Sequence, residues 1–431
     1  MTKTPKEVFQ ARFGRRRFLG TALAGAGAAI LGSFPRISIA GTKTVKLGMN
    51  IPMTGDYAPW GLPGLYGCQI IANNLNTDGG VKIGGDRYMI EMVAYDHGYD
   101  TEKAIQGFKK LALQDKVKMV MMLGGSTVGS VLPFAMRRKM LTSTLLPSDI
   151  TPETPYLVAP CESHPLYNVT GVEWLARKNP NAKTAVIITT NDIEYGKQSA
   201  ATYNAAFEVE GIKVVDVNFH GFDVVDFAPI VSSLLAKKPD IFCMATDVYT
   251  TPIVEQLFHQ GYKGKIVSCT LDGYQDVIAK TSKEFVEGLT YQFPDFDDPA
   301  LNKPGINFPD PGGFDMAFNK DHAGEWSAVA WEYPSILLNW VEAAKAAGSV
   351  EPVAVTDAMK ADSSPPHTFG PGKWWGKELW GLSNAVVGDW PVVAINNGKA
   401  RIQEFRSVYN WLQKYNNVLK KHMQALDLRT V

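Results

Sequence analysis

The residues with the clearest chemical potential are hydroxyl, aromatic and carboxylate side chains that follow apolar runs of the sequence. They are Tyr57, Trp60, Ser126, Thr127, Ser148, Asp149, Tyr195, Asp247, Tyr249, Asp272 and Tyr274. Ser126 and Thr127 come after Gly124-Gly125, where a helix is predicted to begin, so their hydroxyls and backbone N–H groups can hold an anionic group such as a carboxylate. Together these side chains are typical of a binding site for a small organic molecule.

Each of these residues also has a purely structural interpretation, which the sequence leaves open. Trp60 can cover an apolar edge, and Ser126 and Thr127 can serve as helix caps. Asp149 and Asp272 can belong to turns.

Motifs for catalysis are missing from the sequence. The seven histidines are scattered, and no HExxH motif or Cys/His cluster occurs, so a zinc site has no support. The segment 124–128 lacks the second glycine of a nucleophile elbow. We therefore expect no catalytic residues, no metal and no cofactor. The four cysteines, Cys68, Cys161, Cys243 and Cys269, form no CxxC pair, and we expect no essential disulfide.

Alternating strands and helices must position the candidate residues. Apolar runs predict strands at 45–49, 88–95, 119–123, 184–188, 213–217, 241–245 and 265–269. Apolar residues at helical spacing predict helices around 65–75, 104–112, 195–208, 227–236, 251–260 and 405–426. Two successive series of this kind indicate an α/β protein with two doubly wound lobes, in which ligands bind beyond the carboxyl ends of strands.

Two segments break this alternation. The segment 293–324 is rich in proline, glycine and aspartate and predicts an irregular loop. The segment 365–381 contains Trp374, Trp375 and Trp380, and we expect the Trp374-Trp375 pair to pack structurally rather than to contact a ligand.

The N-terminal segment 1–40 has the order of an export signal. Arg15-Arg16-Arg17-Phe18-Leu19 precedes an apolar stretch rich in glycine and alanine, and Ser38-Ile39-Ala40 resembles a cleavage site. The arginine pair indicates the twin-arginine route, which predicts a periplasmic protein cleaved near Ala40. The alternative is a membrane anchor, but the apolar stretch is short and weakly hydrophobic.

Removing this segment makes the chain acidic. Seven of the 43 basic residues and one of the 43 acidic residues lie within 1–40, so the remainder carries six more acidic than basic residues. Nucleic acid or anionic lipid is therefore not expected as a partner, because either one requires a basic face.

Short motifs, in order, resemble the type I periplasmic binding proteins, specifically the leucine/isoleucine/valine-binding branch that serves ABC importers. They are Met53-Thr54-Gly55 through Trp60-Gly61, Asn76 through Val81, Tyr95-Asp96, Tyr195-Gly196 and Asp272-Gly273. The resemblance covers about 45–405. It implies two lobes joined by three crossover strands, with an N-terminal lobe of 41–163 plus about 292–385 and a C-terminal lobe of 164–291 plus about 386–431.

The resemblance also implies a function and residue roles. Trp60 would lie over the ligand, Ser126 on its carboxylate, Ser148 near its ammonium, Tyr195 on the second-lobe wall and Asp272 opposite the ammonium. The chain would be a monomeric, non-catalytic carrier of an amino acid, amide or related organic acid, and its partners would be an ABC permease and ATPase. A ligand sensor and a periplasmic hydrolase remain alternatives.

The sequence departs from this family's pattern at the predicted amino acid site. Ile150 stands at or beside the position of a threonine that grips the amino acid backbone, and Asp149 adds an extra carboxylate next to it. The family's small disulfide near Tyr95-Asp96 is missing. Together with Tyr57, Trp60, Tyr249 and Tyr274, these departures favour a larger or aromatic organic acid over an ordinary aliphatic amino acid.

Overall fold

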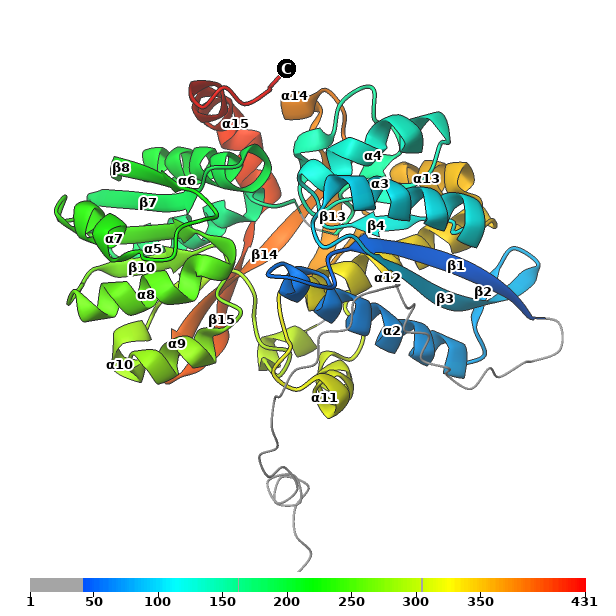
Figure 1. Ribbon diagram of the computed structural model, residues 1–431, viewed down its shortest axis with the longest axis horizontal. Coiled ribbons are helices and arrows are strands. Elements are labelled where there is room, and N and C mark those ends of the chain that lie inside the picture. Colours follow the sequence, from blue (N-terminus) through cyan, green and yellow to red (C-terminus); the bar gives the residue numbers. More distant parts are fainter. Residues whose placement is uncertain (1–41, 162, 304) are drawn as a thin grey trace, which may run out of the picture. The chain divides into compact units, whose positions relative to one another are not determined.

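The first predicted strand forms β1 (Thr42–Ile51), an inner strand of a six-stranded sheet. Most of its apolar side chains are buried. A computed structural model describes residues 42–161, 163–303 and 305–431, which belong to one unit (Figure 1). The export signal predicted over 1–40 lies outside the described residues.

The first lobe is built on this sheet, with strand order β2-β3-β1-β4-β5-β6. Its other strands are β2 (Val81–Ile83), β3 (Asp86–Asp96), β4 (Val120–Met122), β5 (Thr142–Ser143) and β6 (Leu157–Val158). All except β2 run parallel, so their carboxyl ends meet at one edge of the sheet. Helices α2 (Leu62–Thr77), α3 (Thr101–Lys110) and α4 (Ser126–Arg137) connect them.

The second lobe is built on a mixed nine-stranded sheet. Its parallel strands are β7 (Thr184–Thr190), β8 (Lys213–His220), β9 (Ile241–Ala245), β10 (Lys265–Ser268) and β11 (Thr290–Tyr291). Its helices are α5 (Val169–Lys178), α6 (Gln198–Val209), α7 (Ala228–Leu235), α8 (Thr250–His259), α9 (Tyr274–Lys280) and α10 (Lys283–Val286). The prediction of two α/β lobes is therefore confirmed.

Antiparallel strands complete the second sheet. They are β12 (Pro366–His367), β13 (Gly370–Trp375), β14 (Ala385–Asn396) and β15 (Lys399–Ser407). The chain passes between the lobes after β6, after β11 and along β14, whose first residue also bridges to Ala159. The exact lobe boundaries remain a prediction. Helix α15 (Val408–Ala425) then packs on α6.

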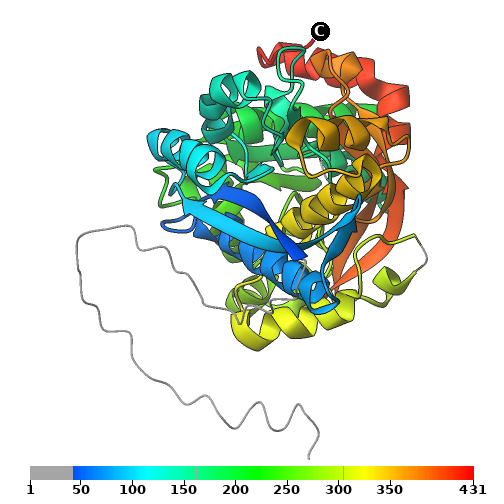
Figure 2. The same cartoon turned by 90° about the vertical axis from the view of Figure 1, so that its right-hand side faces the viewer.

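The prediction of an irregular loop over 293–324 is wrong for its second half, which forms helix α11 (Pro311–His322). Buried aromatic rings hold this segment in place. The ring centroid of Trp331 lies 3.9 Å from that of Phe296 and 4.7 Å from that of Phe308, and the centroids of Phe314 and Phe296 are 4.8 Å apart. Trp331 belongs to α12 (Val329–Ala347), a long helix beside α2 in both views (Figures 1 and 2). Burial of these rings stabilises a segment whose local sequence favours turns.

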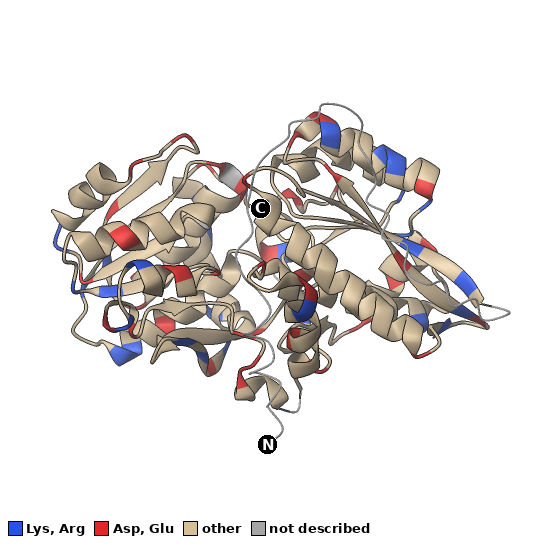
Figure 3. Ribbon diagram, turned by 60° about the horizontal axis from the view of Figure 1, so that its bottom comes forward, with Lys and Arg blue, Asp and Glu red and all other residues tan. Residues whose placement is uncertain are grey.

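The tryptophan-rich segment 365–381 also has regular structure, including β12, β13 and the short helix α14 (Lys377–Trp380). Trp375 and Trp380 are buried and pack edge to face, and the Trp374 indole donates to the Met359 carbonyl of α13 (Pro352–Ala361). Within the described residues, no helix combines the length and apolar character needed to cross a membrane. Basic and acidic residues are interspersed over both lobes (Figure 3).

Candidate functional site

A cavity of about 230 Å³ lies where the carboxyl ends of strands from both lobes meet. Most of its lining residues lie at or after the ends of β1, β3, β4, β5 and β6 of the first sheet and of β7, β8 and β10 of the second, and two more come from α12. They are Tyr57, Trp60, Tyr99, Leu123, Ser126, Leu145, Leu146, His164, Tyr167, Thr190, Asp192, Glu194, Tyr195, Phe222, Thr270, Val329 and Glu332. The parallel strands therefore place this cavity where ligands usually bind in open α/β sheets.

Aromatic rings form one wall of this cavity. Tyr57 stacks on Tyr99 with ring centroids 4.4 Å apart, and Phe222 of the second lobe meets Tyr57 edge-on at 6.4 Å. Gly125 allows this arrangement, because a Cβ atom there would lie 2.4 Å from the Tyr99 hydroxyl, and its φ of +64° favours glycine. Ser126 follows as the first residue of α4, so backbone N–H groups at the start of the helix face the same region.

A tight turn after β7 forms the opposite wall. Asp192 begins the π-helical turn η5 (Ile193–Lys197), and its carboxylate accepts hydrogen bonds from the backbone N–H of Tyr195 at 2.7 Å and of Gly196 at 3.3 Å. Thr190 donates its hydroxyl to the same carboxylate. These bonds fix the turn and hold the Tyr195 ring parallel to His164, with centroids 4.6 Å apart.

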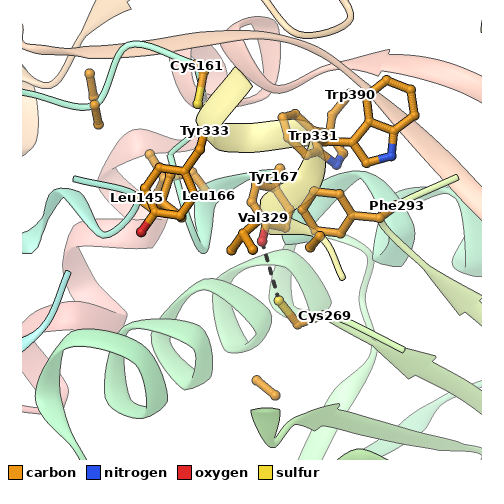
Figure 4. Packing of buried hydrophobic residues seen from close by; sticks show 14 of the residues in the cluster. Leu145, Cys161, Leu166, Tyr167, Cys269, Phe293, Val329, Trp331, Tyr333 and Trp390 are labelled. Atoms are coloured by element: carbon orange, nitrogen blue, oxygen red, sulfur yellow. Dashed lines mark hydrogen bonds between the residues drawn. The ribbon is translucent and has the colours of Figure 1, made fainter. Parts of the chain in front are cut away.

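His164 belongs to a buried polar network behind the cavity. Its Nδ1 lies 2.7 Å from the Tyr167 hydroxyl and 3.5 Å from Cys269 Sγ, and its Nε2 lies 3.3 Å from Ser199 Oγ. Figure 4 shows the Tyr167 hydroxyl directed at Cys269, 3.7 Å away. Burial lowers the pKa of His164 to about 3, so the imidazole is neutral at pH 7 and adds no positive charge to the cavity.

Four of the residues predicted from the sequence line the cavity: Tyr57, Trp60, Ser126 and Tyr195. Six others lie outside its lining: Thr127, Ser148, Asp149, Tyr249, Asp272 and Tyr274. The side chain of Asp247 lies outside the described part of the structure.

Three of the six make hydrogen bonds that hold loops in place. Thr127 donates to the Gly124 carbonyl at 2.8 Å. Tyr249 donates to the Phe222 carbonyl at 2.8 Å and so supports a residue that does line the cavity. Tyr274 donates to Asp295 at 2.7 Å.

Asp272 supports the helix that carries Val329 and Glu332 to the cavity. Its Oδ2 accepts a hydrogen bond from the Ala328 N–H at the start of α12, at 3.1 Å, where a carboxylate is favourable. The other oxygen is buried without a partner among the described residues. Burial raises the pKa of Asp272 to about 7.

Ser148 and Asp149 occupy the short turn η3 (Pro147–Asp149) after β5. The Ser148 hydroxyl and Asp149 Oδ2 are both buried with no hydrogen-bond partner in the described structure. Burial, and then the negative charge of Glu194, raises the pKa of Asp149 to about 6, while Arg429 opposes this shift. Asp149 of the first lobe and Glu194 of the second lobe are therefore close enough to interact.

Several lining residues were missed in the sequence, and they are Tyr99, Leu123, Leu145, Leu146, His164, Tyr167, Thr190, Asp192, Glu194, Phe222, Thr270, Val329 and Glu332. Tyr99, Asp192 and Phe222 come just after predicted strands, so the rule that sites lie at strand ends could have found them. Glu332 could not be found in this way, because it lies on a helix that was not predicted. Within the described ranges, no cluster of His, Cys, Asp or Glu side chains could hold a metal ion.

Comparison with known proteins places the chain among binding proteins. The model of the periplasmic binding protein family matches residues 44–400. No curated protein matches the chain.

Solved structures share the fold at low sequence identity. A leucine-binding protein from Thermotoga maritima is 18% identical with a TM-score of 0.67, and the match covers 84% of this chain and 99% of that one. A solute-binding protein of an ABC transporter from Rhodopseudomonas palustris HaA2, in complex with p-hydroxybenzoic acid, is 18% identical with a TM-score of 0.70, covering 86% and 100%. A fatty acid ABC transporter substrate-binding protein from Thermomonospora curvata is 20% identical with a TM-score of 0.69, covering 86% and 94%.

Proposed function

Because the chain belongs to the periplasmic binding protein family, we propose that it is the periplasmic substrate-binding component of an ABC importer. It binds an amino acid, an amide or a related organic acid, aromatic acids included, between its lobes, and it acts as a monomer without a catalytic step. Its partners are a membrane permease and an ATPase. Closure of the lobes around the ligand creates the form that docks on the permease.

One observation carries this proposal: the cavity is lined by strand-end residues of both lobes. A ligand there makes contacts with both lobes at once, and these contacts are best when the lobes are closed. Differential contacts of this kind are what allow a ligand to shift an equilibrium between open and closed states. The structural neighbours support the small size of the ligand, because their own ligands include leucine and p-hydroxybenzoic acid.

A thermal-shift screen tests the proposal directly. The mature protein is heated with amino acids, amides and aromatic acids, and we expect at least one of them to raise the melting temperature, because ligand binding stabilises the folded state by mass action. Ser126→Trp fills the cavity and should abolish this effect, since Ser126 is exposed and lines it. Ser233→Trp, at an exposed position on α7, is the matched control. Stabilisation that survives Ser126→Trp would place the ligand elsewhere.

A further inference from the structure

We infer that the ligand of this cavity carries a net positive charge: an organic amine on an aromatic or branched aliphatic body. This inference rests on the proposed role as a substrate-binding component, and it assigns that role a different ligand class, an amine in place of an amino acid, amide or organic acid. The observation behind it is the charge of the lining: among the residues that the structure describes there, Asp192, Glu194 and Glu332 are acidic and none is a lysine or an arginine.

The three acidic side chains lie in different surroundings. Asp192 already accepts hydrogen bonds from two backbone N–H groups and from Thr190, so its charge is largely compensated. Glu194 follows it in the first turn of η5. Glu332 lies in the first turn of α12 with only 4% of its surface exposed, so its carboxylate is removed from bulk water. Burial disfavours the ionised form of an acid unless a cation pairs with it, so a cationic ligand beside Glu332 would stabilise its carboxylate form.

The aromatic wall provides a second feature that suits an amine. The stacked pair of Tyr57 and Tyr99, the Phe222 ring and Trp60 all border the same cavity. Aromatic faces attract ammonium groups through their negative electrostatic potential, and they also bury the apolar part of a ligand. Carboxylates and ring faces together therefore favour a cation with an apolar body.

Positive charge near the cavity is too weak to favour an acid. His164 is neutral at pH 7 because of its burial, and the guanidinium of Arg429 does not line the cavity but donates to the Ile150 carbonyl at 2.6 Å. The start of α4 offers only partial positive charge through its N–H groups. A zwitterion would place its carboxylate there and so add a negative charge to the cavity that holds Glu194 and Glu332, whereas an amine adds none.

Two matched series of compounds test this inference. The first is 2-phenylethylamine, phenylalanine and 3-phenylpropanoate, and the second is 3-methylbutylamine, leucine and 4-methylpentanoate. We expect the amine to bind most tightly in at least one series by isothermal titration calorimetry, by tenfold or more over the acid. An amino acid or acid that binds more tightly than its amine would overturn the inference and leave the proposed function intact. Absence of binding by every amine, amino acid and acid tested would reject both.

Variants of the carboxylates give an independent readout. Glu194→Gln and Glu332→Gln should each weaken binding of the amine by roughly tenfold or more, while binding of the neutral analogue 2-phenylethanol or 3-methylbutanol stays the same. Glu351→Gln is the matched control, because its side chain is 64% exposed and pairs with Lys118 outside the cavity. If Glu332→Gln unfolds the protein, the binding of the amine and of its neutral analogue by Glu194→Gln alone tests the inference. An equal loss for the amine and its neutral analogue would contradict the charge argument.

Discussion

Trp60 is the single side chain that best reports on the cavity. It lines the cavity at the end of the short helix η1 (Ala58–Trp60), and its indole N–H is buried without a partner in the described structure. We expect Trp60→Ala to weaken binding of any stabilising compound by at least about tenfold, which is about 1.4 kcal/mol, and to remove a ligand-linked change in tryptophan fluorescence.

The matched control for Trp60 is Trp174→Ala on α5. Both indoles are half-buried against the core, but Trp174 lies outside the cavity. Fluorescence titration and calorimetry should therefore show normal binding in the control. Normal binding by Trp60→Ala would remove this residue from the site.

Asp272 links the stability of the protein to pH. Its native pKa of about 7 lies above the usual value near 4, so the native state holds a proton that the unfolded state has lost between these two values. The contribution of this group to the free energy of unfolding therefore falls as pH rises from about 4 to 7. The asparagine side chain of Asp272→Asn would remain uncharged at every pH. We therefore expect the free energy of unfolding of Asp272→Asn to rise by on the order of 1–3 kcal/mol relative to that of the wild type over this range.

Thermal unfolding at pH 5 and pH 8 measures this linkage. The melting temperature of Asp272→Asn, relative to that of the wild type, should be higher at pH 8 than at pH 5. The control is Asp276→Asn, at an exposed position on α9, whose relative melting temperature should not change with pH. A difference that does not depend on pH would show that Asp272 is charged in the native state.

The elements that carry the site were only partly predictable. Strands β1, β4, β7 and β9 were predicted from short segments rich in apolar residues, and the residues after β1, β4 and β7 do border the cavity. Strand β14 was not predicted, because Gly388 and Pro391 interrupt it and such residues usually argue against a strand.

Distant packing explains the remaining differences. Helix α11 begins with a favourable Asp310 cap and Pro311 at its first position, but Gly312 and Gly313 weaken it. It is also held by aromatic contacts that no local pattern reveals. Glu332 is another example, because it reaches the cavity only through the docking of α12 beside α2. Local patterns thus predicted the strand ends, whereas long-range packing decided which helices border the site.

The C-terminal segment after α15 connects two regions of the fold. Helix α15 is attached to α6 through Glu208, whose carboxylate accepts from Lys421 at 2.8 Å and lies 2.6 Å from His422 Nε2. Beyond the helix, Arg429 donates to the Ile150 carbonyl at 2.6 Å, and the Val431 N–H donates to the Leu379 carbonyl at 3.0 Å. This segment therefore holds the turn that contains Ser148 and Asp149.

Removing the guanidinium should loosen this turn. We expect Arg429→Ala to lower the free energy of unfolding by about 0.5–1.5 kcal/mol and to speed amide hydrogen exchange over 147–151, because Arg429 is exposed and its hydrogen bonds are only partly shielded. Arg87→Ala is the matched control, since this exposed arginine also donates to carbonyl groups, those of Gly79 and Gly80. Exchange over 147–151 that stays unchanged in Arg429→Ala would show that the C-terminal segment does not hold the turn.

The molecule as a whole is compatible with folding before export. Cys68, Cys161, Cys243 and Cys269 are all free and buried, so the described structure does not depend on an oxidising compartment. The two lobes bury their apolar residues in one continuous cluster, which can form in the cytoplasm. These features agree with the twin-arginine signal proposed from Arg15 and Arg16, because that route carries folded proteins.

Export therefore provides a test of the whole precursor. We expect Arg15→Lys with Arg16→Lys to leave the full-length chain folded in the cytoplasm, because the arginine pair is the recognised feature of such a signal. Cell fractionation measures the location, and a compound that stabilises the mature protein should still stabilise the retained precursor, which shows that it folded before crossing. Arg12→Lys keeps the arginine pair and should be exported normally. Normal export of the double variant would instead indicate a route for unfolded chains, and the precursor would then have to fold in the periplasm.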